Sequence, residues 1–161
     1  MDETQTRRGF CGNACRALSL AALGGALASV LESCGASGNS PTSGSLETLP
    51  QLTASATGSS IVLTIDASSP LATTGNAALL QYQGGYLLIG RSSDTTFTAL
   101  SAICTHQACL IGARAGTAYF CGCHGSEFDA SGRVLVGPAV FPLAQYPTQY
   151  DATKKTLTIS V

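Results

Sequence analysis

From about residue 50 onward, apolar and polar residues alternate with a period of two, the spacing typical of strands with one buried face. The segment 61–66 (IVLTID) predicts a strand. The segment 77–91 predicts a hairpin, because two apolar runs flank Gly84 and Gly85, which accommodate a tight turn. Further strand-like segments are 95–103, 117–122, 132–140, 141–151 and 155–161. Since no helical period appears here, the pattern predicts an all-β domain over 50–161, a sandwich or small barrel.

The first 34 residues have a different pattern and predict an export leader. Arg7 and Arg8 precede an apolar stretch over 17–31, an arrangement typical of a twin-arginine signal. This stretch of about fifteen residues is shorter than the roughly 20 that a spanning helix needs, which favours cleavage over an uncleaved anchor. The sequence LESC, ending at Cys34, resembles a lipoprotein box, in which the cysteine is lipidated after cleavage. Simple cleavage nearby is the alternative.

Residues 35–49 predict a flexible linker. The run GASGNSPTSGS is rich in Gly, Ser and Pro, which bury too little apolar surface to offset their ordering entropy. Such a linker would let the folded domain stand away from a membrane. The 161 residues suffice for one domain with a modest core. A net charge of −1, with only 11% charged residues, indicates no nucleic-acid partner.

Two short clusters hold the residues with metal-binding chemistry. CTHQAC (104–109) and CGCHGS (121–126) contain four of the seven cysteines and both histidines of the chain. A structural zinc ion would use two cysteines and two histidines, but it leaves Cys109 and Cys123 without a role. Disulfides alone leave the histidines unexplained. A two-iron, two-sulfur cluster, with cysteines on one iron and histidines on the other, uses all six residues.

The two motifs together resemble the signature of the Rieske iron–sulfur family. The resemblance extends through FDASGRVLVGPA (128–139), which is similar to the segment after the second cluster loop in Rieske proteins of cytochrome bc complexes. It implies a Rieske-type antiparallel β-sandwich or small barrel that binds a [2Fe-2S] cluster. The cluster-binding loops would form a subdomain at one end, at about residues 103–139. The disulfide-containing members, of the cytochrome bc and arsenite oxidase small-subunit types, are the most similar.

The resemblance also implies a role for each residue of the two motifs. The implied pairs are Cys104 with Cys121 on one iron, His106 with His124 on the other, and Cys109 with Cys123 in a disulfide. That disulfide would close a loop of about fifteen residues and add roughly 3 kcal/mol of stability. It requires an oxidising compartment, which agrees with the predicted export leader.

Four more residues are expected to surround and tune the cluster. Ser126 matches a family serine whose hydroxyl bonds to a bridging sulfide and stabilises the reduced state. Phe128 stands where bc-type proteins usually carry a tyrosine that bonds to a ligand sulfur. Gly137 and Pro138 begin a third loop covering the cluster. We therefore expect a reduction potential below that of bc-type proteins with both hydroxyl groups. It should lie above the about −400 mV of four-cysteine plant-type clusters, because neutral imidazoles replace two thiolates.

The predicted function is one-electron transfer at the periplasmic face of a bacterial cytoplasmic membrane. The sequence shows no nucleophile with a base and no second metal site, so we expect an electron-transfer subunit and not a catalyst by itself. The expected donor is quinol with a cytochrome b-like or a molybdenum subunit, and the expected acceptor is cytochrome-like. Membrane association would come from the leader, a lipid or a partner. The alternatives are a free-standing periplasmic Rieske ferredoxin and a zinc-stabilised binding module. The oxygenase components of the family generally lack the disulfide pair.

Overall fold

The computed structural model describes residues 45–161, all within the unit Ser40–Val161. The predicted leader and most of the predicted linker lie outside the described residues. Residues 45–161 form strands, turns and loops, and this part of the chain includes no helix able to cross a membrane.

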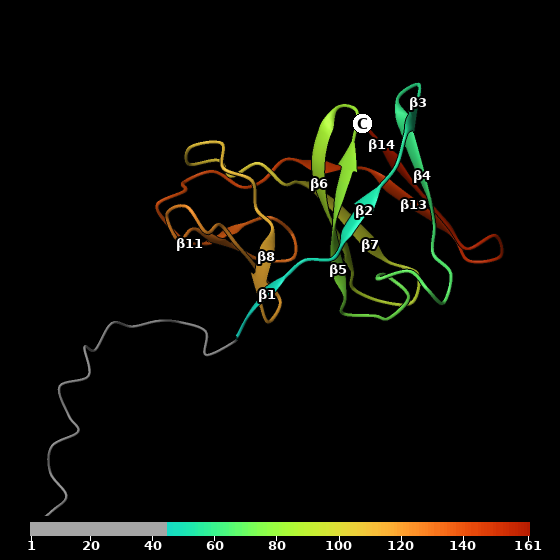
Figure 1. The fold of residues 1–161 in the computed structure, drawn as a ribbon, viewed down its shortest axis with the longest axis horizontal. Coiled ribbons are helices and arrows are strands. Elements are labelled where there is room, and N and C mark those ends of the chain that lie inside the picture. Colours follow the sequence, from blue (N-terminus) through green and yellow to red (C-terminus); the bar gives the residue numbers. More distant parts are fainter. Residues whose placement is uncertain (1–44) are drawn as a thin grey trace, which may run out of the picture. The chain divides into compact units, whose positions relative to one another are not determined.

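Within residues 45–161, fourteen strands form three sheets (Figure 1). The first sheet, in spatial order, contains β1 (Leu46–Thr48), β8 (Ala113–Ala115), β9 (Ala118–Phe120), β10 (Glu127–Phe128) and β11 (Val134–Val136). The second contains β12 (Gln145–Tyr146), β7 (Phe97–Ser101), β6 (Gly85–Arg91), β5 (Ala77–Tyr82) and β2 (Gln51–Thr53). The third contains β13 (Thr148–Asp151), β14 (Thr156–Ser160), β4 (Ser60–Thr64) and β3 (Ala56–Thr57). Adjacent strands are antiparallel except β2 and β5, which are parallel.

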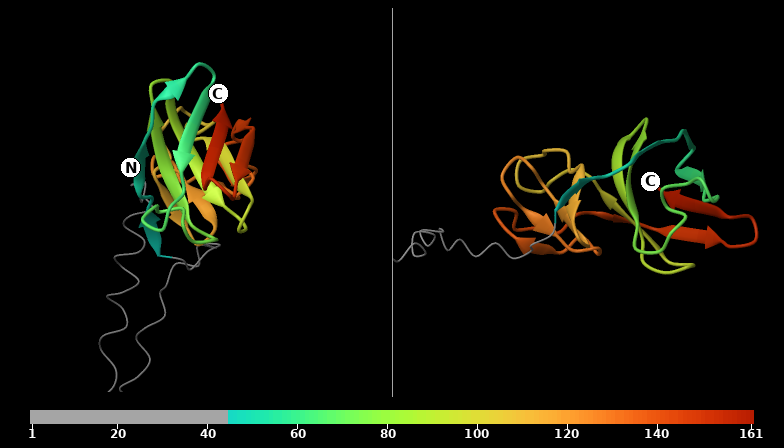
Figure 2. Two further views of the ribbon diagram at one scale, coloured as in Figure 1. Left: turned by 90° about the vertical axis from the view of Figure 1, so that its right-hand side faces the viewer. Right: turned by 60° about the horizontal axis from the view of Figure 1, so that its bottom comes forward.

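The second sheet separates two hydrophobic cores. Alternate side chains of its strands enter opposite cores, so Leu79 and Leu88 lie in one while Leu80 and Leu87 lie in the other. The first core, toward β8–β11, also contains Cys104, Cys121 and Phe128. The second core, toward β4 and β14, contains Ile61, Leu63, Leu157 and Ile159. In the right-hand view of Figure 2, β5 and β6 (green) lie between β8–β11 (orange) and β13–β14 (red).

The predicted hairpin over 77–91 is present, and glycine is required at positions 84 and 85 for different physical reasons. The strands β5 and β6 pair from Ala77↔Gly90 to Tyr82↔Gly85. Gly85 has a positive φ of 135°, which favours glycine. Gly84 has no positive φ; a Cβ there would collide with the ring of Tyr82.

The all-β fold class predicted from the sequence is confirmed, and the linker boundary needs adjustment. Residues 46–48, assigned to the linker by composition, form β1 and pair with β8, and the next residue, Leu49, is buried. Composition did not indicate this strand, because β1 has only exposed side chains and joins the sheet through its backbone.

Candidate metal centre

The two predicted metal-binding loops share one backbone arrangement. The first follows β7 and the second follows β9. In each loop, the N–H four residues after the first cysteine donates to that cysteine's carbonyl oxygen: Ala108 to Cys104 and Gly125 to Cys121, both at 2.9 Å. In each, the N–H of the first cysteine donates to the carbonyl five residues later, at 2.8 Å to Cys109 and 2.9 Å to Ser126. The loops are therefore two copies of one hydrogen-bonded turn.

The shared turn requires a left-handed residue at its fifth position. Gly125 meets this requirement with φ 79°, whereas Ala108 adopts φ 55° with a side chain. Left-handed backbone costs an L-residue roughly 1–2 kcal/mol, so Ala108 is strained where glycine would not be. A Cβ built on Gly125 meets no atom within 4 Å, so its requirement is conformational and not steric.

A disulfide joins the two loops, as the resemblance implied. Cys109 and Cys123 are bonded, with their Cα atoms 6.5 Å apart and a sequence separation of 14. The bond fixes the spacing of the two turns, each of which is closed by its own backbone hydrogen bonds.

The other two cysteines of the loops are free thiols at the base of the loops. Cys104 and Cys121 are both buried, and each belongs to the first hydrophobic core. Burial raises the pKa of the Cys121 thiol, and the adjacent Cys104 sulfur raises it further. The backbone N–H groups of Cys123 and His124 donate to the Cys121 sulfur and act in the opposite direction. Two sulfur donors therefore lie together inside the protein.

The two imidazoles lie together on the outer side of the loops. The ring centroids of His106 and His124 are 4.8 Å apart, and the rings meet edge to face at 86°. His124 is exposed, and His106 is partly buried. The Nδ1 atom of His106 is buried and has no hydrogen-bond partner among the described residues. A buried nitrogen lone pair without a donor fits a metal ligand, since buried polar atoms are otherwise nearly always satisfied.

The donor set fits two metal positions better than one. Paired thiols inside and paired imidazoles outside are the donors of a two-iron centre with mixed ligation. A tetrahedral zinc site instead directs all four donors at one point. Within residues 45–161, no group of three or more Cys, His, Asp or Glu side chains surrounds a single ion position.

A third loop, starting at Gly137 and Pro138, closes over this region, and their peptide bond is cis. The hydroxyl oxygen of Ser126, which is fully buried, accepts from the Ala139 N–H at 3.0 Å. Its own proton stays available for donation, because a hydroxyl is donor and acceptor at once. Thr105 donates to the Phe141 carbonyl at 2.6 Å and so ties the first loop to the third.

Phe128 lies beneath the loops, in the same core as Cys104 and Cys121, with 0% of its surface exposed. Packing alone therefore explains its apolar character. It carries no hydroxyl to donate to a ligand sulfur.

Sequence reasoning did not identify two features near the loops. One is the Thr105 hydroxyl. Its position between the predicted ligands Cys104 and His106 was the only sign of it in the sequence. The other is Tyr119, whose side chain is buried between the first and second sheets. Burial raises the pKa of Tyr119 to about 12, although Arg114 and a hydrogen bond with Thr98 act against this shift.

The fold and the donor set define an iron–sulfur electron-transfer protein. The family model of the Rieske [2Fe-2S] domain matches residues 62–147, more than half of the chain. The chain therefore belongs to the Rieske [2Fe-2S] family, and its cofactor is a [2Fe-2S] cluster.

Similar proteins include the cytochrome b6-f complex iron-sulfur subunits of two bacteria. The subunit of Chlorobaculum thiosulfatiphilum is 32% identical over 78 residues, covering 48% of this chain and 42% of the relative. That of Prochlorococcus marinus (strain NATL1A) is 37% identical over 86 residues, covering 50% of this chain and 48% of the relative. The matched region thus spans less than half the length of these curated relatives.

A similar solved structure is the cyanobacterial plasma membrane Rieske protein PetC3 from Synechocystis PCC 6803. It superposes with a TM-score of 0.51 at 26% identity, covering 62% of this chain and 99% of that chain. The likeness agrees with the fold of the described strands.

Proposed function

We propose that this protein transfers single electrons through its [2Fe-2S] cluster, with Cys104 and Cys121 on one iron and His106 and His124 on the other. The observation that carries the proposal is the arrangement of the two loops. Their thiols are buried, their imidazoles are adjacent on the outside, and a disulfide fixes the distance between them. The outer iron would then lie next to the protein surface, where an electron can reach a partner.

The cluster supplies reversible one-electron chemistry, at a potential raised by the two neutral imidazoles. The chain's own residues set its environment. Ser126 would donate its hydroxyl proton toward the cluster, while its oxygen accepts from the Ala139 N–H. The imidazole nitrogens not bound to iron can release protons. We therefore expect the potential to fall as pH rises, which couples electron and proton transfer.

The three loops near the two histidines contain no charged residue, which indicates the kind of partner. The sequence has no Asp, Glu, Lys or Arg over 95–113, 115–126 or 134–150. Val140 and Phe141 are 75% and 67% exposed, and Leu110 is 43% exposed. Exposed apolar groups beside a redox centre suit a partner with an apolar docking surface. Association with such a partner should depend only weakly on salt.

The proposed setting is the outer face of the cytoplasmic membrane. There the protein would act as the iron–sulfur subunit of a quinol-oxidising or related respiratory complex. Residues 1–34 would direct export and 35–45 would connect the folded domain to the membrane or a lipid. The similarity to cytochrome b6-f subunits supports a cytochrome-containing partner.

Metal analysis of the purified protein tests the ligand assignment. We expect a red-brown protein with two irons and two acid-labile sulfides per chain. His124→Ala and Cys121→Ser should each abolish the colour. A colourless protein with one zinc per chain, after expression in iron-replete cells, would favour a zinc-stabilised module instead.

Isolation from native membranes in mild detergent tests the partner. Co-purification of a b-type cytochrome would support the complex. A free-standing ferredoxin is the second candidate, because exposed Gln107 follows His106 where a leucine often shields the cluster in quinol-oxidising members. Recovery of the protein alone, with its cluster intact, would favour that candidate.

A further inference from the structure

A cleft formed by residues other than the predicted metal ligands lies between the two sheets that enclose the first core. It has a volume of about 240 Å³. Gly90, Arg91 and Thr98 line it from the second sheet, Asn76 lines it from the loop before β5, and Arg114 and Tyr119 line it from the first sheet. Most of its surface is carbon, so a ligand with an apolar body would be accommodated.

The two arginines of the cleft contribute in different ways. Arg91 donates to the backbone carbonyl oxygens of Leu71, Ala72, Ser93 and Asp94. These acceptors fix the guanidinium but carry no net charge. No carboxylate of residues 45–161 forms an ion pair with Arg91, and the Asp94 carboxylate instead accepts from Thr74. The Arg91 guanidinium lies over the rings of Phe97 and Tyr150, on the side of the second core, so it contributes no charged donor to the cleft.

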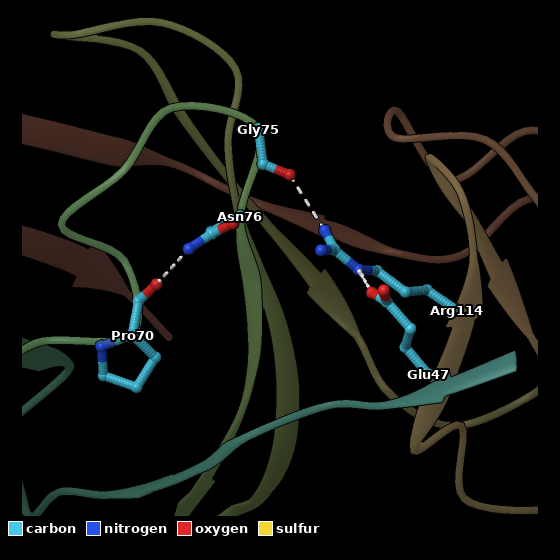
Figure 3. Close-up of polar contacts among 5 residues, drawn as sticks. All are labelled: Glu47, Pro70, Gly75, Asn76 and Arg114. Atoms are coloured by element: carbon cyan, nitrogen blue, oxygen red, sulfur yellow. Dashed lines mark hydrogen bonds and ion pairs between the residues drawn. The ribbon is translucent and has the colours of Figure 1, made fainter. Parts of the chain in front are cut away.

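Arg114 offers the hydrogen-bond donors that Arg91 lacks. Its Nε donates to Glu47 at 3.1 Å and its Nη1 to the Gly75 carbonyl at 2.8 Å. Figure 3 shows the guanidinium reaching from β8 toward the loop before β5, with Glu47 on one side. Nη2 makes no hydrogen bond to residues 45–161. The Arg114 side chain is 20% exposed, so a charge-assisted hydrogen bond there is partly shielded from water.

We propose that this cleft binds a small organic monocarboxylate, with the carboxylate on Arg114 and the apolar body in the cleft. A single carboxylate group suits the cleft, because the Arg114 guanidinium is the one directed into it and only its Nη2 has no hydrogen-bond partner among residues 45–161. The apolar lining disfavours a fully hydrated inorganic anion. The cleft volume of about 240 Å³ equals that of about eight water molecules, since each occupies about 30 Å³ in the liquid. A molecule of about the size of benzoate therefore fits. This proposal does not depend on the electron-transfer partner.

Calorimetric titration of the full-length, cluster-loaded protein with sodium benzoate at low ionic strength tests the proposal. Benzoate should bind saturably in the millimolar range. Benzamide, its neutral counterpart, should bind at least about tenfold more weakly, because a hydrogen bond to a charged group is worth about that factor or more. Inorganic phosphate should also bind more weakly. Equal binding of benzamide, stronger binding of phosphate, or no saturable binding of benzoate would each overturn the proposal.

Three substitutions localise the site. Arg114→Gln should weaken benzoate binding about tenfold or more, and Arg114→Lys should retain part of it. Arg133→Gln is the matched control, because Arg133 is exposed, lies between β10 and β11, and does not line the cleft. An equal loss in Arg133→Gln would indicate non-specific attraction and would refute the site.

Glu47→Gln gives a prediction of the opposite sign. Glu47 competes with the ligand for the guanidinium and is largely exposed, so its neutralisation should not unfold the protein. Benzoate affinity should rise several-fold. If Arg114 only holds β1 in place, this variant would weaken binding or leave it unchanged, and the proposal would fail.

Discussion

The two halves of the domain, one on each face of the second sheet, are held together by different interactions. The second core is made of large aliphatic and aromatic side chains from regular strands, such as Ile61, Leu157 and Ile159. The first core includes two thiols, and it adjoins a buried serine and loops joined by a disulfide. Both halves bury apolar area, but the half that contains the metal-binding loops (the metal-binding half) adds a disulfide and a buried serine, unlike the half that contains the second core (the scaffold half). Stability and redox properties should therefore respond to different substitutions.

The largest expected effect on stability is in the scaffold half. Leu157→Ala removes a fully buried side chain from β14 and should cost about 2–5 kcal/mol of unfolding free energy. The reduction potential should not change, because Leu157 lies in the core away from the metal-binding loops. Denaturant titration and potentiometry measure the two quantities. Val62→Ala, on the adjacent strand but 56% exposed, should change stability by less than about 0.5 kcal/mol. A shifted potential in Leu157→Ala would show that the halves are coupled.

Removal of the disulfide is the corresponding test in the metal-binding half. The double variant Cys109→Ser, Cys123→Ser should lose about 3 kcal/mol, the chain-entropy value for this loop length. Unlike Leu157→Ala, it should also lose its visible absorbance faster in dilute chelator, because the two loops can then separate. Unchanged stability and unchanged cluster lifetime would mean that the other contacts of the loops are enough to hold them together.

The repeated turn allows a smaller comparison within the metal-binding half. Gly125→Ala should cost about 1–2 kcal/mol, and Ala108→Gly should stabilise by about 1 kcal/mol, because both positions require a left-handed backbone. Lys155→Gly, at φ 53° in the β13–β14 turn, is the control outside the loops. It should stabilise similarly but leave the rate of cluster loss unchanged, whereas Ala108→Gly should slow it. Thermal melts measure the stability of each variant, and visible absorbance measures the rate of cluster loss. Destabilisation by Ala108→Gly would contradict the shared turn.

The strands and the loop residues were predictable from the sequence to different extents. The period-two pattern indicated β4 and β14, because those strands bury alternate side chains. The β5–β6 hairpin was indicated instead by two apolar runs around Gly84 and Gly85, since both faces of its strands are buried. It did not indicate β1, whose side chains are all exposed, or β10, which has only two residues. The motif spacing indicated the disulfide only through the family resemblance, since spacing alone allows several pairings of four cysteines.

Contacts between distant segments were beyond the reach of sequence patterns. Arg114 joins Glu47 to the Gly75 carbonyl across three segments that are far apart along the chain. The symmetry of the two loops was visible as repeated Cys and His residues. Its physical basis, a shared hydrogen-bonded turn with a left-handed fifth residue, required coordinates, because Ala108 does not indicate a positive φ.

The remaining comparison concerns Phe128, where the two halves offer a matched pair of substitutions. Phe128→Tyr adds a hydroxyl in the core that contains Cys104 and Cys121, and a hydrogen bond to a ligand sulfur stabilises the reduced state. One such bond, at about 1 kcal/mol, corresponds to a rise of about 40 mV for a one-electron couple. The added atom also overfills a packed site, so a stability loss of about 1 kcal/mol or more should accompany the rise.

Phe97→Tyr places the same hydroxyl in the scaffold core and should leave the potential unchanged. Potentiometric titration of the wild type, Phe128→Tyr and Phe97→Tyr measures the three reduction potentials. A wild-type potential at the top of the Rieske range, about +300 mV, would contradict the expected effect of the missing hydroxyl. An equal shift in both variants would contradict it as well, because the potential would then depend on general packing and not on a specific hydrogen bond to sulfur.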